Sequence, residues 1–178
     1  LKLLETAVVP DGISVVKAMN LLGLPAKERI TGVDLADKLL RRAGEQGKSV
    51  YLLGAKEEVV SALAQKLKAQ YPQMEVRYKN GYSKDKDADF RDIEAFQPDL
   101  VLVALGVPAQ EKLIARHLGN FSKGVFIGVG GSFDVLSGSK RRAPALFVKT
   151  NTEWLYRILR EPSRLGRFYR NNIKFLGE

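Results

Sequence analysis

Short runs of apolar residues, many of them β-branched, recur along the chain and alternate with longer segments of helical periodicity. The runs occupy residues 6–9, 49–53, 74–78, 99–105 and 124–129. Apolar residues at helical spacing fill 33–46 and 57–70. Runs such as DLVLVAL are typical of strands that helices cover on both faces of a parallel sheet. The sequence therefore predicts an α/β fold with a doubly wound, mainly parallel, Rossmann-like sheet and a C-terminal helical basic appendage.

The positive charge of the chain is concentrated near its C-terminal end. Its 178 residues suit a domain with a substantial core, and it contains no cysteine that could form a disulfide. Residues 139–178 hold ten Lys or Arg and three acids, and thus seven of the nine net positive charges. We therefore expect a domain over 1–150 and an amphipathic basic segment over 151–178 that binds an anionic partner. The stretch 79–89 is expected to be a long exposed loop.

Three glycine-containing stretches follow predicted strands, at 10–12, 106–112 and 128–134. The carboxyl ends of parallel strands meet at one edge of a sheet, where ligands of such folds bind. Glycine lets a ligand approach the backbone, and the amides that begin a helix suit phosphate. The stretches predict a nucleotide site at this edge, with tight turns as the simpler alternative.

Two common nucleotide fingerprints are not met. In the pattern G-x-G-x-x-G that begins at Gly128, residue 133 is Phe where the third glycine is required, and no Walker pattern is present. The first departure argues against a nucleotide-dependent oxidoreductase. Residue chemistry also argues against a dedicated transition-metal site, since the chain has one His and no Cys.

Several polar residues have two interpretations. Asp11 either caps a turn or acts as a general base at the mouth of a pocket, and Asp134 either caps a helix or holds a ribose or base. Arg29 is either a solvated loop residue or a phosphate contact. His117, within a predicted helix, is expected to be a surface residue or a side chain with satisfied hydrogen bonds.

Six stretches together resemble one protein family. VVPDGISVV, LPAKERITGVDL, GVPAQEKLI, GVGGSFDVLSG, KRRAP and EWLYRILREPSR are similar, in kind and in order, to the WecG/TagA/CpsF family of bacterial glycosyltransferases. The resemblance implies that 1–150 is a catalytic domain that binds a UDP-sugar. It implies an inverting transferase, without metal ion or cofactor, that moves an N-acetylmannosamine-type or related sugar to a membrane lipid-diphosphate-linked sugar in teichoic acid or surface polysaccharide synthesis.

The resemblance also implies roles for individual residues. Asp11 would remove the proton of the acceptor hydroxyl, and Arg29 would face the diphosphate or the sugars. The further substrate contacts would come from Tyr82 to the uracil, from Gln110 and Asp134 to the nucleoside, and from the glycines Gly130 and Gly131. Arg157, Arg164 and Arg167 would close over the site from the C-terminal segment. Family members usually carry an upstream segment with a TPN-like stretch that this chain lacks, so an N-terminal truncation is expected.

The expected partners follow from these roles. They are the UDP-sugar, the lipid-diphosphate acceptor and an anionic membrane surface that binds the C-terminal segment, with no nucleic acid. The expected location is the cytoplasm, peripheral on the inner face of the cell membrane. Apolar surface exposed by truncation or by release of the tail would favour a homo-oligomer.

The alternative function is a basic nucleic-acid-binding α/β module. It is motivated by the interleaved arginines and aromatic residues of the tail, namely Arg164, Arg167, Phe168, Tyr169 and Arg170. This alternative leaves the three strand-end stretches unexplained.

Overall fold

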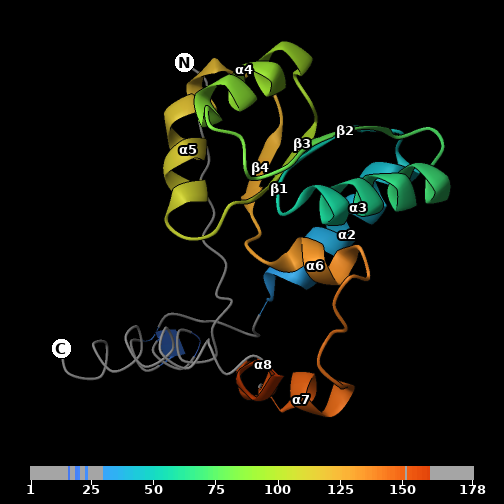
Figure 1. Cartoon of the computed structure of the whole chain (residues 1–178), viewed down its shortest axis with the longest axis vertical. Coiled ribbons are helices and arrows are strands. Elements are labelled where there is room, and N and C mark those ends of the chain that lie inside the picture. Colours follow the sequence, from blue (N-terminus) through green and yellow to red (C-terminus); the bar gives the residue numbers. More distant parts are fainter. Residues whose placement is uncertain (1–15, 17–18, 21–22, 24–29, 151, 161–178) are drawn as a thin grey trace. The chain divides into compact units, whose positions relative to one another are not determined.

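The computed structural model describes residues 16, 19–20, 23, 30–150 and 152–160. The chain divides into two compact units, Leu1–Lys140 and Arg141–Glu178. The elements, shown in Figure 1, are in order α2 (Gly32–Glu45), β1 (Ser49–Gly54), α3 (Glu57–Gln70), β2 (Glu75–Lys79), α4 (Lys86–Phe96), β3 (Leu100–Ala104), α5 (Ala109–His117), η1 (Leu118–Asn120), β4 (Val125–Gly128), α6 (Ser132–Leu136), α7 (Ala145–Lys149) and α8 (Glu153–Arg160).

The described part of the sheet contains four parallel strands in the order β2-β1-β3-β4. Four of the five predicted apolar runs form these strands, and the helical patterns at 33–46 and 57–70 form α2 and α3. The α/β class and the parallel sheet are thus confirmed. The run at 6–9 lies outside the described residues.

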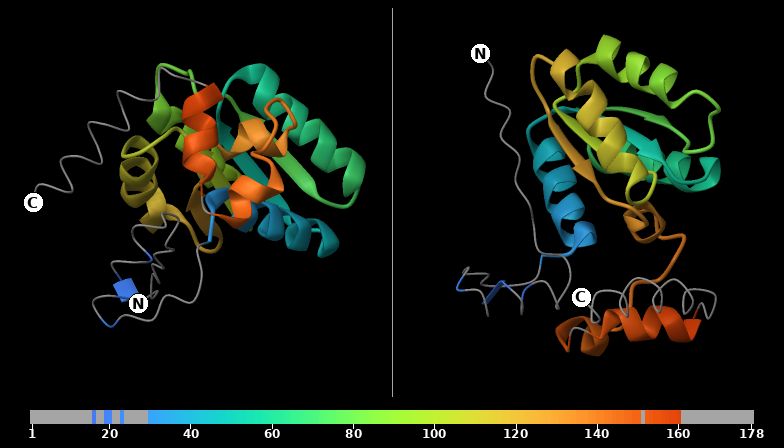
Figure 2. Two further views of the ribbon diagram at one scale, coloured as in Figure 1. Left: turned by 90° about the horizontal axis from the view of Figure 1, so that it is seen from below. Right: turned by 90° about the vertical axis from the view of Figure 1, so that its left-hand side faces the viewer.

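The two central strands are buried on both faces. Val50 and Leu52 of β1 belong to one apolar cluster, together with residues of α2, α3 and α6. Tyr51 and Leu53, which point the opposite way, belong to a second cluster with residues of α4 and α5. Figures 1 and 2 show the two groups of helices on opposite faces of the sheet. The near-continuous apolar character of β1 and β3 is explained by this double covering.

The segment 79–89 is a loop only in part, which corrects the prediction that all of it is exposed. The helix α4 begins at Lys86, and Asp85 caps it by accepting a hydrogen bond, 2.8 Å long, from the backbone N–H three residues on. Phe90 and Ile93, one helical turn apart, are fully buried. The acidic run is therefore the start of a helix, where carboxylates interact favourably with the helix dipole.

His117 joins α4 to α5. Its Nδ1 lies 2.8 Å from Glu94 Oε1 and its Nε2 lies 2.7 Å from Asp87 Oδ1. Its ring stacks on that of Phe90, with a centroid distance of 4.8 Å. The interpretation of His117 as a side chain with satisfied hydrogen bonds is confirmed.

The second unit is described as two helices, α7 and α8. The rings of Phe147 and Tyr156 pack together with a centroid distance of 5.3 Å. A helix is present in the predicted appendage as far as Arg160, and 161–178 lie outside the described residues. Over the part of the chain that the structure describes, every helix is too short or too polar to cross a bilayer.

Asp99 connects three strands at the edge of the sheet where they begin. Its carboxylate accepts hydrogen bonds from the Ser49 backbone N–H at 3.0 Å and hydroxyl at 2.9 Å. Its Oδ1 lies 3.0 Å from Lys123 Nζ, and its carbonyl oxygen accepts from the Val125 N–H at 3.0 Å. The Ser49 N–H, with Lys123, lowers the pKa of Asp99 from 3.8 to about 2.

We predict that Asp99→Asn lowers the free energy of unfolding at pH 7 by about 1 kcal/mol, because the lost charge is partly screened by solvent. A lowered pKa stabilises the fold above pH 3.8, and this contribution is lost as the pH falls to about 2. Urea unfolding at pH values across this range should therefore show that the free energies of unfolding of the unchanged chain and of Asp99→Asn converge as the pH falls. Asp37→Asn, at an exposed position of α2, is the control. A difference in the free energy of unfolding between these two proteins that stays constant from pH 7 to pH 2 would contradict this account.

Candidate functional site

The carboxyl ends of the four strands meet at one edge, which we call the carboxyl edge. The central strands β1 and β3 lead there into α3 and α5. These helices belong to different apolar clusters and so cover opposite faces of the sheet. Where neighbouring parallel strands continue to opposite faces, a crevice forms between their loops, and ligands of open α/β sheets bind there.

The loops at this crevice lie very close together. A Cβ added to Gly54 would lie 2.4 Å from the Ala104 carbonyl oxygen, so only glycine fits. Gly81, after β2, donates its N–H to the Ala55 carbonyl at 2.8 Å. A Cβ on Gly81 would lie 3.1 Å from both Gly54 and Leu105. The loops after β1, β2 and β3 therefore form one packed surface.

Gln110 joins the loop after β3 to the loop after β4. It is 2% exposed, and its Oε1 accepts hydrogen bonds from the backbone N–H of Gly106 at 3.2 Å and of Gly130 at 3.1 Å. Its Nε2 donates to Glu111 Oε1 at 2.8 Å. A Cβ on Gly128 would lie 2.5 Å from that Nε2. Gln110 thus fixes the two loops relative to each other.

The start of α2 lies beside the loop after β4. A Cβ on Gly32 would lie 3.5 Å from the Ser132 hydroxyl oxygen, and that hydroxyl donates to the Val129 carbonyl at 2.6 Å. Thr31 caps α2 by accepting the Asp34 N–H at 3.1 Å, and its hydroxyl lies 2.6 Å from Asp34 Oδ2. The amino end of α2 is thus at the carboxyl edge.

Five of the predicted site residues lie in the loops of this edge or in the first turns of the helices that follow them. Gln110 and Gly130 are in direct contact, and Gly131 follows at the start of α6. A Cβ on Gly131 would lie 3.9 Å from Asp134 Oδ2, so these four residues form one group. Tyr82 is 72% exposed and follows Gly81, on the loop packed against the ends of β1 and β3.

The other predicted site residues are not tested. Asp11, Arg29, Arg164 and Arg167 lie outside the described residues. Arg157 lies in α8, and its side chain is outside the description. Their roles stay predictions.

Two residues that the sequence analysis did not select hold the loop after β2. Asn80 accepts the Tyr82 N–H at 2.9 Å and donates to Glu57 Oε2 at 2.8 Å. Asp89, in the first turn of α4, is 1% exposed. The position of Asn80 before a glycine was a signal for a turn residue that binds its own backbone. Asp89 was missed because the start of α4 was taken for a loop.

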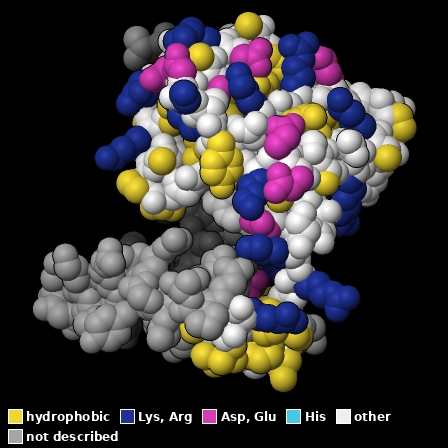
Figure 3. All heavy atoms as spheres, viewed as in Figure 1, with side chains coloured by type: hydrophobic (Ala, Val, Ile, Leu, Met, Phe, Trp, Pro, Cys, Tyr) yellow, Lys and Arg dark blue, Asp and Glu magenta, His cyan; other side chains and the backbone are white. Residues whose placement is uncertain are grey.

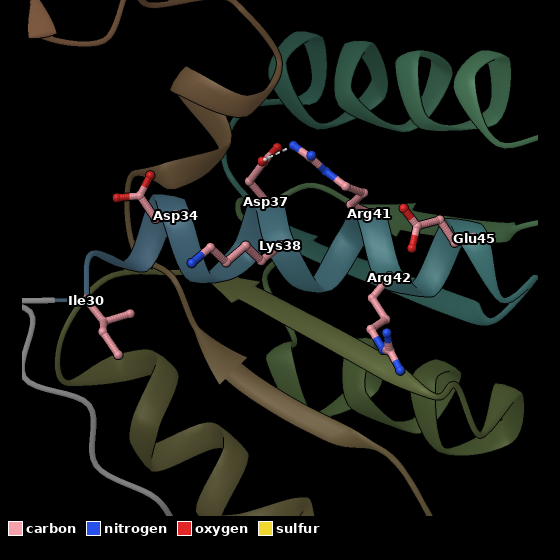
Figure 4. Close-up of a pocket in the computed structure, with 7 residues that line it drawn as sticks. All are labelled: Ile30, Asp34, Asp37, Lys38, Arg41, Arg42 and Glu45. Carbon is pink, nitrogen blue, oxygen red and sulfur yellow. Dashed lines mark hydrogen bonds and ion pairs between the residues drawn. The ribbon is translucent and has the colours of Figure 1, made fainter.

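A separate groove of about 470 Å³ runs along α2 (Figure 4). Its described lining residues are Ile30, Asp34, Asp37, Lys38, Arg41, Arg42 and Glu45. The Asp37 and Arg41 side chains pair across one helical turn at 3.1 Å. None of the described predicted site residues lines this groove, so the loops of the carboxyl edge are the better candidate site.

The glycines of these loops suit a polar ligand that approaches the backbone closely. A Cβ built on Gly106 or Gly130 meets no atom of the described residues within 4 Å. Among the described residues, no group of three His, Cys, Asp or Glu is arranged to hold a metal ion. On the face of the α/β unit seen in Figure 3, basic and acidic side chains are interspersed. A site for a nucleotide fits this arrangement better than a broad surface for nucleic acid.

Comparison with known proteins finds similarity over almost the whole chain. A family model described as "Glycosyl transferase WecG/TagA/CpsF family" matches residues 4–178. Three relatives, from Bacillus spizizenii (strain W23), Bacillus subtilis (strain 168) and Staphylococcus aureus (strain MW2), are 41%, 40% and 41% identical over 161 residues. All three are named N-acetylglucosaminyldiphosphoundecaprenol N-acetyl-beta-D-mannosaminyltransferase. The match covers 90% of this chain and 63% of each relative, so the chain spans slightly less than two thirds of their length.

We predict that Gln110→Ala loosens the two loops that it joins. The substitution removes Oε1, the acceptor that the Gly106 and Gly130 N–H groups share. This should lower the free energy of unfolding by about 1–3 kcal/mol. Amide hydrogen exchange at both glycines should become about tenfold faster. Gln70→Ala, at the exposed end of α3, is the control, and unchanged exchange in Gln110→Ala would show that the loops are held by other contacts.

Proposed function

This chain belongs to the WecG/TagA/CpsF family of glycosyltransferases, and on that premise we propose that it transfers an N-acetylmannosamine-type sugar from UDP to a lipid-diphosphate-linked acceptor. The names of its relatives specify N-acetyl-β-D-mannosamine as the sugar and N-acetylglucosaminyldiphosphoundecaprenol as the acceptor. The observation that carries the proposal is the group formed by Gln110, Gly130, Gly131 and Asp134 at the carboxyl edge. Family membership favours this function over the nucleic-acid-binding alternative.

The proposed donor site lies over the loops that follow β3 and β4. No described residue approaches the Cβ positions of Gly106 and Gly130 within 4 Å, which supports close approach of a diphosphate to the backbone there. The Asp134 carboxylate, with 31% of its side chain exposed, is accessible to accept hydrogen bonds from a ribose or from the base. Tyr82 supplies an exposed aromatic face for the uracil. The loops would thus hold the nucleotide without a metal ion.

The proposed reaction is a single displacement at the anomeric carbon. The acceptor hydroxyl attacks that carbon from the face opposite UDP, the bond to the diphosphate oxygen breaks, and Asp11 takes the hydroxyl proton. Arg29 and the arginines of the C-terminal segment, Arg157, Arg164 and Arg167, would stabilise the charge that develops on the departing UDP. The resemblance of the motifs that contain Asp11, Arg29, Arg157 and Arg164 supports these roles, and Arg167 lies three residues after the last of these motifs.

The lipid-linked acceptor also gives the basic C-terminal segment a proposed role. Residues 139–178 carry seven of the nine net charges, and Leu159 of α8 is 68% exposed. A helix that combines apolar and basic residues binds an anionic membrane surface through both. We therefore place the proposed enzyme peripherally on the inner face of the cell membrane. A homo-oligomer is also compatible with this proposal.

We predict that UDP stabilises the folded chain. A ligand that binds only the folded state contributes about 2.7 kcal/mol at a hundred times its Kd, which should raise the melting temperature by about 5–10 °C. ADP should raise it much less. Asp134→Ala should reduce the UDP shift, whereas the control Asp37→Ala on α2 should not. Equal shifts with UDP and ADP, or no shift with either, would overturn the proposed donor site.

We predict that Asp11→Asn lowers sugar transfer to a lipid-diphosphate acceptor by at least about a hundredfold, because the amide cannot accept the proton. The UDP-induced rise in melting temperature should be unchanged, since Asp11 is assigned to the acceptor. Turnover should be followed by release of UDP. A turnover close to that of the unchanged chain would remove Asp11 from this role.

A further inference from the structure

The loop at residues 80–85, which carries Tyr82, is held to the body of the protein at its start. The Gly81 N–H binds the Ala55 carbonyl at 2.8 Å, and Asn80 Nδ2 binds Glu57 at the beginning of α3 at 2.8 Å. The oxygen of the same Asn80 amide accepts the Tyr82 N–H at 2.9 Å. The backbone of Tyr82 is thus tied to the ends of two strands and to a helix.

A buried carboxylate holds the rest of this loop. Asp89 is 1% exposed, and it accepts a hydrogen bond from the Ser83 hydroxyl. Its Oδ1 lies 3.0 Å from Lys79 Nζ, at the end of β2, and its Oδ2 lies 3.9 Å from Lys86 Nζ. Lys86 Nζ in turn donates to the Ser83 carbonyl oxygen at 2.7 Å. Asp89 thereby connects the last residue of β2, the middle of the loop and the first turn of α4.

Burying a charge is unfavourable unless partners compensate for it. Here the compensation comes from groups of the loop and its flanks, and the hydrogen bond and charge of Asp89 raise the pKa of Lys79. The next residue, Phe90, is fully buried in the apolar cluster beneath the loop. The carboxylate is therefore tied to the core on one side and to the loop on the other, while Tyr82 beyond it stays 72% exposed.

We propose that Asp89 is a positioning residue for recognition of the nucleobase. Acting through Ser83 and Lys86, it holds the loop so that Tyr82 is in place before the nucleotide binds. Binding then needs little ordering of the loop, which increases affinity. This inference rests on the proposed UDP donor, and it assigns the loop to recognition of the nucleobase rather than of the diphosphate.

The test measures Kd values for UDP and for inorganic pyrophosphate by calorimetry. Ser83→Ala and Asp89→Asn should each weaken UDP binding about tenfold and leave pyrophosphate binding within about twofold, because only the base half is affected. In a Tyr82→Ala background, Ser83→Ala should have little further effect on UDP, since it acts through Tyr82. The matched control is Ser122→Ala, which removes a loop hydroxyl that binds Gln97 at 2.9 Å where β4 begins.

Other outcomes would overturn either the positioning role of Asp89 or the proposed function. Unchanged UDP affinity in Ser83→Ala, equal losses for UDP and pyrophosphate, or additive effects of Ser83→Ala and Tyr82→Ala would overturn the positioning role while leaving UDP binding intact. If the unchanged chain does not bind UDP, the proposed function itself fails. Should Asp89→Asn not fold, Ser83→Ala decides the question, because it removes one hydroxyl from a partly exposed position.

Discussion

Burial of β1 and β3 on both faces is the constraint on which the rest of the structure depends. Because every side chain of Val50–Leu53 is buried, helices must cover both sides of the sheet, and polar loops are confined to its two edges. The order β2-β1-β3-β4 then brings the loops after all four strands to one edge. The candidate site is therefore a consequence of strand burial, and its polar residues lie where the core ends.

Two kinds of contact make this edge a defined surface. Glycines leave little room for side chains, because Gly54 and Gly81 lie against the backbone of neighbouring residues and Gly128 lies against the Gln110 side chain. Buried polar side chains then connect the loops, Gln110 between those after β3 and β4 and Asp89 around the one after β2. Their hydrogen bonds and ion pairs fix the backbone on which a ligand would rest. Gln110 thus supports the loops in addition to its predicted contact with the nucleoside.

The sequence predicted the elements whose signal is local. The apolar runs that form β1 and β3 are unambiguous, and the grouping of Gln110 with Gly130 followed from the meeting of parallel strand ends. The start of α4 was missed because an acidic run resembles a loop until the burial of Phe90 and Ile93 is known. The role of Asp89 was unpredictable for the same reason, since its partners depend on how β2 and α4 meet. Asp11, Arg29 and the C-terminal arginines stay predictions.

The amino edge of the sheet has a different character. There Asp99 connects the beginnings of β1, β3 and β4, and the nearby Gln97 accepts from the backbone N–H and the hydroxyl of Ser122. None of the described residues proposed to bind the donor belongs to this network. Directed evolution for heat tolerance could therefore concentrate its libraries at this end of the strands, while libraries for altered donor choice sample the other end.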